Sequence, residues 1–231
     1  LDPSAVRGVT EGLDDERFAD LVEQMDPDDA ADVLGDLSDE QSEKVLEHME
    51  QDGAREVRAL LTYDEHTAGG IMTSRLVSCS QTDTVADAVN RLRSWSEQEE
   101  EIHYLYVVDD EQRLLGTVPL KRLVVAAADS SLSHITSRDP IVVHTGADQE
   151  EIAQLFTEYG LVALPVVDGD DRLVGRVTFD DAVDVIREEA TEDIYEMAAL
   201  VSEAFERSSV LGAIRGRLPW LLVCLVGTLL S

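Results

Sequence analysis

Two stretches of this chain repeat one another, and this internal repeat constrains the fold more than any other feature. Within 105–118 the chain reads LYVVD and then LLGTV, and the pattern returns 59 residues later as LPVVD and LVGRV. Each copy is typical of two short buried strands joined by an acidic turn, which is a β-hairpin. An apolar pattern with helical spacing precedes each hairpin, and another helix is expected after it. The sequence therefore predicts two tandem βαββα modules, at 69–130 and 131–190.

The residues before the first module carry a shorter repeat, with a period of twelve residues. Its large apolar positions are Leu1, Leu13, Met25, Leu37, Met49 and Leu61. The units open with helix-start chemistry: Asp26 precedes Pro27, and Ser38 stands three residues before Gln41 as in a capping box. One short helix cannot bury its apolar stripe alone, so we expect 1–68 to form an all-α superhelix of stacked short helices. The spacing leaves its hand open.

The last forty or so residues predict a helix and then a membrane segment. From Thr191 the apolar residues return with helical periodicity, which predicts a long connecting helix over 191–215. The run 218–230 contains no charge, and a bilayer needs about 20 apolar residues. We interpret 216–231 as the start of a transmembrane helix; a buried core helix is the alternative. Arg215 and Arg217 just before the run predict that residues 1–215 lie on the cytoplasmic side of the cell membrane.

The charge of the chain excludes one class of partner. With 49 acidic and 18 basic residues the net charge is −31, so no nucleic acid is expected to bind. Only Lys44 and Lys121 are lysines, and an acidic, lysine-poor surface favours a halophilic protein that works at high salt. A GC-rich genome is the alternative explanation for the missing lysines. We predict no enzyme, because the histidines and serines are scattered without a paired nucleophile.

Five motifs resemble known families. The segment 175–181 (GRVTFDD), with the paired hairpins, resembles CBS modules, whose tandem pairs often bind adenosine nucleotides. The remaining four, in this order, resemble the cytosolic portion of MgtE-type magnesium channels: 25–31 (MDPDDAA), 67–73 (TAGGIMT), 188–194 (EEATEDI) and 217–221 (RLPWL). The resemblance implies an α+β multidomain fold with a helical N domain, a CBS pair and a connecting helix. It also implies a homodimer through the CBS modules, a pore domain of the same protein, and Mg²⁺ as the regulatory ion.

The candidate metal ligands are carboxylates, because Mg²⁺ prefers oxygen ligands and keeps several waters. Asp181, Asp184 and Glu188 are spaced three and four residues apart and so share one helical face. A hydrated acidic face would explain this spacing equally well. The resemblance implies instead that the face holds Mg²⁺ between the CBS modules, the N domain and the connecting helix. The predicted metal residues are Asp181, Asp184, Glu188, Glu189, Glu192 and Asp193, with Asp64 and Glu65 from the N-domain side.

Comparison of the two modules bears on nucleotide binding. Thr178 and Asp181 suit contacts with phosphate and ribose in the second module, whereas Pro119 and Arg122 occupy the equivalent positions in the first. Arginine has no acceptor for a ribose hydroxyl. ATP is therefore expected at one site at most.

Two functions follow from these observations. One is the cytosolic Mg²⁺-sensing gating domain of a magnesium channel, which closes the pore when internal Mg²⁺ is high. The alternative is an adenosine-nucleotide-sensing CBS module that regulates another membrane protein.

Overall fold

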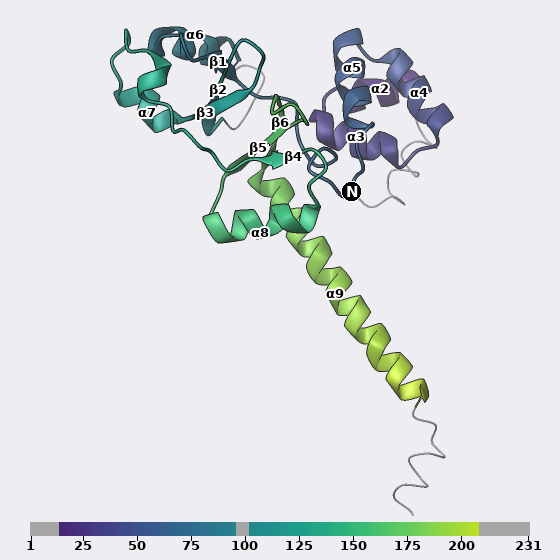
Figure 1. The fold of residues 1–231 in the computed structure, drawn as a ribbon. Helices are drawn as coiled ribbons and strands as arrows, with labels where there is room; N and C mark the ends of the chain where they lie inside the picture. The colour runs from purple at the N-terminus through teal and green to yellow at the C-terminus, as the bar shows by residue number, and fades with distance from the viewer. Residues whose placement is uncertain (1–13, 96–101, 208–231) are drawn as a thin grey trace, which may run out of the picture. The chain divides into compact units, whose positions relative to one another are not determined.

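The computed structural model describes residues 14–95 and 102–207 of the 231-residue chain. The chain divides into two compact units, Leu1–Val185 and Ile186–Ser231. The first unit contains the helical N domain and both βαββα modules, and the second begins inside the last helix, α9 (Phe179–Arg207). Figure 1 shows the order of these elements.

Four short helices form the N domain: α2 (Asp15–Val22), α3 (Pro27–Gly35), α4 (Asp39–His48) and α5 (Gln51–Leu60). Each begins twelve residues after the one before, which confirms the predicted repeat over the described residues. Helix α2 packs against α4 and α3 packs against α5. Each of these helices therefore buries its apolar stripe against the helix of the next repeat but one, as stacking of repeats requires.

The predicted helix starts are also present. The Ser38 hydroxyl accepts the backbone N–H of Gln41, whose side chain accepts the N–H of Ser38 in return, which completes the capping box. Pro27 opens α3, but the Asp26 side chain makes no capping bond. Its carboxylate instead accepts from the Arg75 guanidinium at 2.9 Å.

The two modules have the same topology. In the first, β1 (Ser78–Ser80) runs parallel to β2 (Tyr104–Val108), which pairs with β3 (Leu114–Pro119) in an antiparallel hairpin. Helix α6 (Val85–Trp95) precedes the hairpin and α7 (Leu120–Val125) follows it. The second module has β4 (Val143–His144), α8 (Gln149–Tyr159), β5 (Ala163–Val167), β6 (Leu173–Thr178) and the start of α9 in the same order, after a 3₁₀ turn at Leu132–His134. The predicted tandem βαββα pair is confirmed.

The modules exchange their leading segments. Thr73 lies in the segment that leads to the first module, and it forms an antiparallel bridge with Arg176 on β6 of the second module. Ser137 lies in the segment that leads to the second module, and it forms an antiparallel bridge with Thr117 on β3 of the first module. Each sheet is therefore completed by backbone from the segment that leads to the other module.

The segment that leaves the N domain also attaches to the second module. The N–H groups of Ala68 and Gly69 donate to the carbonyls of Ala147 and Thr145, each at 2.8 Å. Gly70 lies so close to the preceding turn that an added Cβ would sit 2.3 Å from the Asp64 carbonyl oxygen. The apolar core agrees with these contacts: one cluster includes Leu34 and Val57 of the N domain, Met72 of the junction and Ile152 of the second module. The first module has a separate core, around Leu105 and Leu132.

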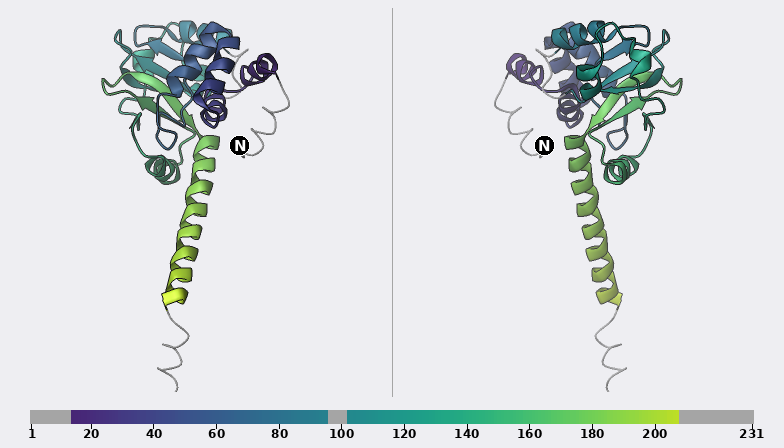
Figure 2. Two further views of the ribbon diagram at one scale, coloured as in Figure 1. Left: turned by 90° about the vertical axis from the view of Figure 1, so that its right-hand side faces the viewer. Right: turned by 90° about the vertical axis from the view of Figure 1, so that its left-hand side faces the viewer.

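Helix α9 continues without interruption from the second module to Arg207 (Figure 1 and Figure 2). The predicted connecting helix from Thr191 is thus the later part of the module's own last helix, and no break marks the boundary expected at residue 190. The predicted membrane segment, 216–231, lies outside the described residues. Within 14–95 and 102–207, no helix combines the length and the apolar character that crossing a bilayer requires.

Candidate functional site

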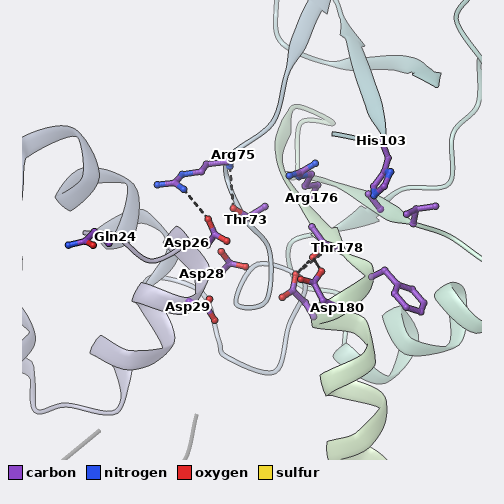
Figure 3. Close-up of a pocket in the computed structure, with 14 residues that line it drawn as sticks. Gln24, Asp26, Asp28, Asp29, Thr73, Arg75, His103, Arg176, Thr178 and Asp180 are labelled. Carbon is purple, nitrogen blue, oxygen red and sulfur yellow. Dashed lines mark hydrogen bonds and ion pairs between the residues drawn. The ribbon is translucent and has the colours of Figure 1, made fainter. Parts of the chain in front are cut away.

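An acidic turn of α3 faces the acidic start of α9 across a cavity of about 750 Å³ (Figure 3). The first turn of α3 contributes Asp28 and Asp29, and the first turn of α9 contributes Asp180 and Asp181. The cavity is lined by residues of the N domain and both modules: Gln24, Asp26, Asp28, Asp29, Thr73, Arg75, His103, Val162, Ala163, Arg176, Thr178, Phe179, Asp180 and Asp181. All of them belong to the first unit.

The surroundings of Asp28 disfavour the ionised form of its carboxyl group. Its Oδ1 atom is buried and has no hydrogen-bond partner among the described residues. Burial raises the pKa of its carboxyl to about 7, and repulsion from the Asp181 carboxylate adds to this effect. A buried carboxylate beside a second one disfavours its own ionised form. Asp28 is therefore the carboxylate that a bound cation would relieve most.

The neighbouring carboxyl groups are shifted in the same direction. Burial raises the pKa of Asp29, and repulsion from Asp26, Asp180 and Asp184 raises it further. The pKa of Asp32 is raised to about 6, first by partial loss of solvation and then by Asp29, with contributions from Asp181 and Glu65. These effects connect acidic residues of α3 with acidic residues of α9, although the two helices are far apart in sequence.

Asp181 has a structural role as well as a place in this site. Its Oδ2 atom accepts the backbone N–H of Thr178 at 3.2 Å and also the Thr178 hydroxyl, as in a capping box at the start of α9. The pKa of Asp181 is raised by burial, while the hydrogen bonds from Thr178 act in the opposite direction. The carboxylate is thus held in a fixed position at the cavity wall.

The structure brings some of the predicted metal residues together. Asp181 and Asp184 lie near the α3 carboxylates, as their effects on Asp29 and Asp32 show. Asp64 and Glu65 follow α5, and each has a carboxylate oxygen within 4 Å of His66 Nδ1, at 3.8 and 3.6 Å. Of this pair, Glu65 is connected to the site through its effect on Asp32.

The other predicted residues lie further along α9. Glu188 and Glu189 belong to the second unit, and the side chains of Glu192 and Asp193 lie outside the described set. Among the described residues, no group of three or more His, Cys, Asp or Glu side chains is arranged to hold a metal ion.

Sequence reasoning missed the α3 carboxylates of this site. Asp28, Asp29 and Asp32 stand on α3, whereas the prediction named Asp64 and Glu65. The twelve-residue repeat did place Asp28 and Asp29 in the first turn of a helix. Acidic residues are common there because they complement the helix dipole, so their position alone gave no signal of a site.

The equivalent place in the first module differs in charge and shape. Arg122 occupies the position of Asp181, and its guanidinium donates to the Ile135 carbonyl at 3.1 Å. Pro119 occupies the position of Thr178 and makes no side-chain cap. A smaller cavity of about 180 Å³ lies between this module and the segment that leads to the second, lined by Gln81, Val107, Leu115, Ser133, Thr136 and Arg138.

Known proteins share this arrangement of domains. The sequence profile of the MgtE intracellular N domain matches residues 1–66, and the CBS domain profile matches residues 68–129 and 132–188. A crystal structure of the soluble part of a magnesium transporter is 39% identical with a TM-score of 0.74, over 77% of this chain and 70% of that one. The chain belongs to the MgtE family of magnesium transporters. A second structure, of the cytosolic domain of the Mg²⁺ channel MgtE in complex with ATP, is 35% identical with a TM-score of 0.76, over 80% of this chain and 76% of that one.

Curated members of the MgtE family give the same result. The magnesium transporter MgtE of Enterococcus faecalis is 40% identical over 74% of this chain and 37% of its own length. MgtE of Thermus thermophilus is 43% identical over 63% of this chain and 32% of its own length. The chain therefore matches about a third of the length of these relatives, which are transporters rather than enzymes.

Proposed function

We propose that this chain is the cytosolic Mg²⁺-sensing part of a magnesium transporter or channel, and that it closes the pore when internal Mg²⁺ is high. One observation carries the proposal: the acidic turn of α3 and the acidic start of α9 line one cavity, where the Asp181 carboxylate disfavours ionisation of Asp28. Two carboxylates about 4 Å apart repel by roughly 4 kcal/mol at an effective dielectric constant of 20. A divalent cation between them replaces this repulsion with attraction to both.

The ligands of this ion come from both sides of the cavity. Mg²⁺ usually takes one or two carboxylates and keeps several waters, so a pair such as Asp28 and Asp181 suffices for one ion. Asp184 and Asp29 are the adjacent candidates. Asp64, Glu65, Glu188, Glu189, Glu192 and Asp193 remain proposed ligands of further ions.

The gating step follows from the continuity of α9. Asp181 and Asp184 stand in its first two turns, and the same helix runs on to Arg207. An ion that binds the start of α9 to the N domain therefore restricts the movement of a helix that leads toward the membrane. In the complete protein we place a pore domain after this chain, in the cell membrane, with residues 1–215 on the cytoplasmic side.

We also propose that the chain forms a homodimer through its CBS modules. Val124 and Val125 at the end of α7 are each 83% exposed, which leaves an apolar surface on the first module. Covering such side chains is favourable at about 25 cal/mol per Å².

A second candidate function is nucleotide sensing at the same cavity. The MgtE cytosolic domain solved with ATP supports it, as do two features of this chain. Arg176 is 6% exposed and lines the cavity, and Thr178 and Asp181 line the same cavity. We propose that ATP binds at this one site and modulates the Mg²⁺ response. If the chain responds to ATP and not to Mg²⁺, it is instead a nucleotide-sensing regulator of another membrane protein.

Small-angle scattering of the chain during a MgCl₂ titration at constant ionic strength tests the leading proposal. The sensor should become more compact at millimolar MgCl₂, and the variant Asp28→Asn/Asp181→Asn should lose this response. The matched control is Asp20→Asn/Asp110→Asn, which removes the same charge from two exposed positions outside the cavity. Equal compaction with KCl, or an unchanged response of the cavity variant, would contradict Mg²⁺ sensing at this site.

A further inference from the structure

An ion pair at the edge of the acidic cavity connects the N domain to Arg75, which lies two residues after the backbone bridge from Thr73 to the second module. The Arg75 guanidinium lies 2.9 Å from the Asp26 carboxylate, and the two side chains are 31% and 68% exposed. Asp26 immediately precedes α3 and so belongs to the N domain. Figure 3 shows this pair beside Asp28 and Asp29.

Arg75 is held in place by the second module. Two residues earlier, Thr73 exchanges two backbone hydrogen bonds with Arg176 of β6, each at 2.9 Å. The intervening residue, Ser74, donates its hydroxyl to Glu56 on α5. The segment 73–75 therefore bonds to the second module through its backbone and to the N domain through two successive side chains.

The partner of Arg75 is also part of the acidic group described above. The Asp26 carboxylate raises the pKa of both Asp28 and Asp29 by repulsion. The Arg75 guanidinium thus pairs a permanent positive charge with one carboxylate of this acidic group. It offsets the repulsion that Asp26 exerts on Asp28 and Asp29, and unlike a divalent cation it cannot dissociate from the chain.

We propose that Arg75 is a built-in latch, which keeps the N domain docked on the second module in part of the population when no divalent cation is bound. This inference rests on the Mg²⁺-sensing function proposed above. Under that function, the latch sets the fraction of molecules that are already docked before Mg²⁺ binds. Fewer ions then have to bind before the domain is fully compact. The latch also weakens with salt, because exposed charges are screened over about 10 Å at 0.1 M ionic strength.

The size of the effect follows from the exposure of the pair. Exposed ion pairs contribute little, because solvent screens them, and the Arg75 and Asp26 side chains are 31% and 68% exposed. We expect loss of the guanidinium to lower the docking equilibrium constant about two- to fivefold.

The test measures docking directly, by pulsed electron paramagnetic resonance on the full chain. Spin labels at Glu47→Cys on α4 and Glu158→Cys on α8 report the separation of the N domain and the second module, and both positions are exposed. Cys224→Ser removes one native thiol, and Cys79 can remain because it is 1% exposed. Arg75→Gln is compared in EDTA with Arg55→Gln, which removes the same charge from a pair within α5, Arg55–Asp52 at 3.3 Å.

The latch predicts that Arg75→Gln lowers the docked fraction in EDTA and that Arg55→Gln leaves it unchanged. The exchange Asp26→Arg/Arg75→Asp should restore it, which also shows that loss of docking is not loss of folding. Equal docked fractions for the two Gln variants in EDTA would overturn the latch, as would a wild type that is fully undocked there. A second measurement, with MgCl₂ in place of EDTA, tests the sensing function independently of the latch. If MgCl₂ fails to restore docking of Arg75→Gln, the Mg²⁺-sensing proposal is wrong, whereas the latch is still supported by the EDTA comparison.

Discussion

Asp181 at the start of α9 raises the pKa of Asp28 at the start of α3, although the two residues belong to different domains. The contact exists because the N domain shares its apolar core with the second module, not with the first module that follows it in sequence. The first turns of two helices thereby become the opposite walls of one cavity. This relationship predicts that the stability of the domain depends on pH.

Asp28→Asn should make the chain more stable than wild type at pH 8 when divalent cations are chelated. The pKa of Asp28 rises from its ordinary value of 3.8 to about 7 in the folded protein, so ionisation opposes folding. The penalty is absent below pH 4, develops between about pH 4 and 7, and is complete above pH 7. A rise of the pKa from 3.8 to about 7 corresponds to at most about 4 kcal/mol of stability, and solvent screening reduces this value. Urea unfolding at pH 5 and pH 8 measures it; an equal difference between variant and wild type at both values would contradict this prediction.

Neutralising the start of α9 should remove protection by Mg²⁺. In Asp181→Asn/Asp184→Asn, MgCl₂ should no longer slow proteolysis at the buried Gly69–Gly70 junction. Because Asp181 also accepts two hydrogen bonds from Thr178 at the start of α9, its replacement alters the helix start as well as ion binding. Asp184→Asn alone therefore separates ion binding from capping. Protection equal to that of wild type in the double variant would exclude both residues as Mg²⁺ ligands.

Local patterns predicted the elements of this fold correctly. The helices of the N domain begin where the twelve-residue repeat places them, and the Ser38–Gln41 capping box forms as expected. Both hairpins also occur at the predicted offset. Each of these features depends on residues within a few positions of one another, so the sequence contains all the information that they need.

Long-range contacts could not be predicted in this way. Adjacency in sequence favours an N domain packed on the first module, whereas the hydrogen bonds of Ala68 and Gly69 attach it to the second. The role of Asp28 depends on that contact, because without α9 it is an ordinary acidic residue in a first turn. The domain boundary expected at residue 190 stays a prediction, because α9 runs through this position without a change of secondary structure.

Titration calorimetry with ATP should detect at most one site per chain. The cavity of the second module has the Thr178 hydroxyl and the Asp181 carboxylate, whereas Arg122 of the first module is bonded to Ile135. Thr178→Ala should weaken ATP binding several-fold by removing one hydrogen bond, and Arg122→Gln should leave it unchanged. Two tight sites, or equal effects of the two variants, would refute the comparison of the modules.

The net charge of −31 predicts a strong dependence of stability on salt. Self-repulsion destabilises the compact state, and KCl screens it. Simple screening is almost complete at about 0.5 M, where the Debye length is only a few ångströms. A free energy of unfolding that continues to rise to about 2 M KCl would support adaptation to high salt, whereas a plateau near 0.5 M would favour screening alone.

Gly70→Ala should destabilise the junction between the N domain and the second module by about 1 to 3 kcal/mol, the usual cost of overpacking. The added Cβ would lie 2.3 Å from the Asp64 carbonyl oxygen and 2.7 Å from the Glu65 Cα, and backbone atoms cannot move aside as a flexible side chain can. The Asp64 carbonyl also accepts the Thr67 hydroxyl at 2.7 Å, so its displacement breaks a further bond. Gly146→Ala is the matched control, because its Cβ would meet no atom within 4 Å. Urea unfolding should show a loss for Gly70→Ala and a change within about 0.5 kcal/mol for Gly146→Ala, and similar values for both would mean that the close approach at Gly70 does not hold the junction.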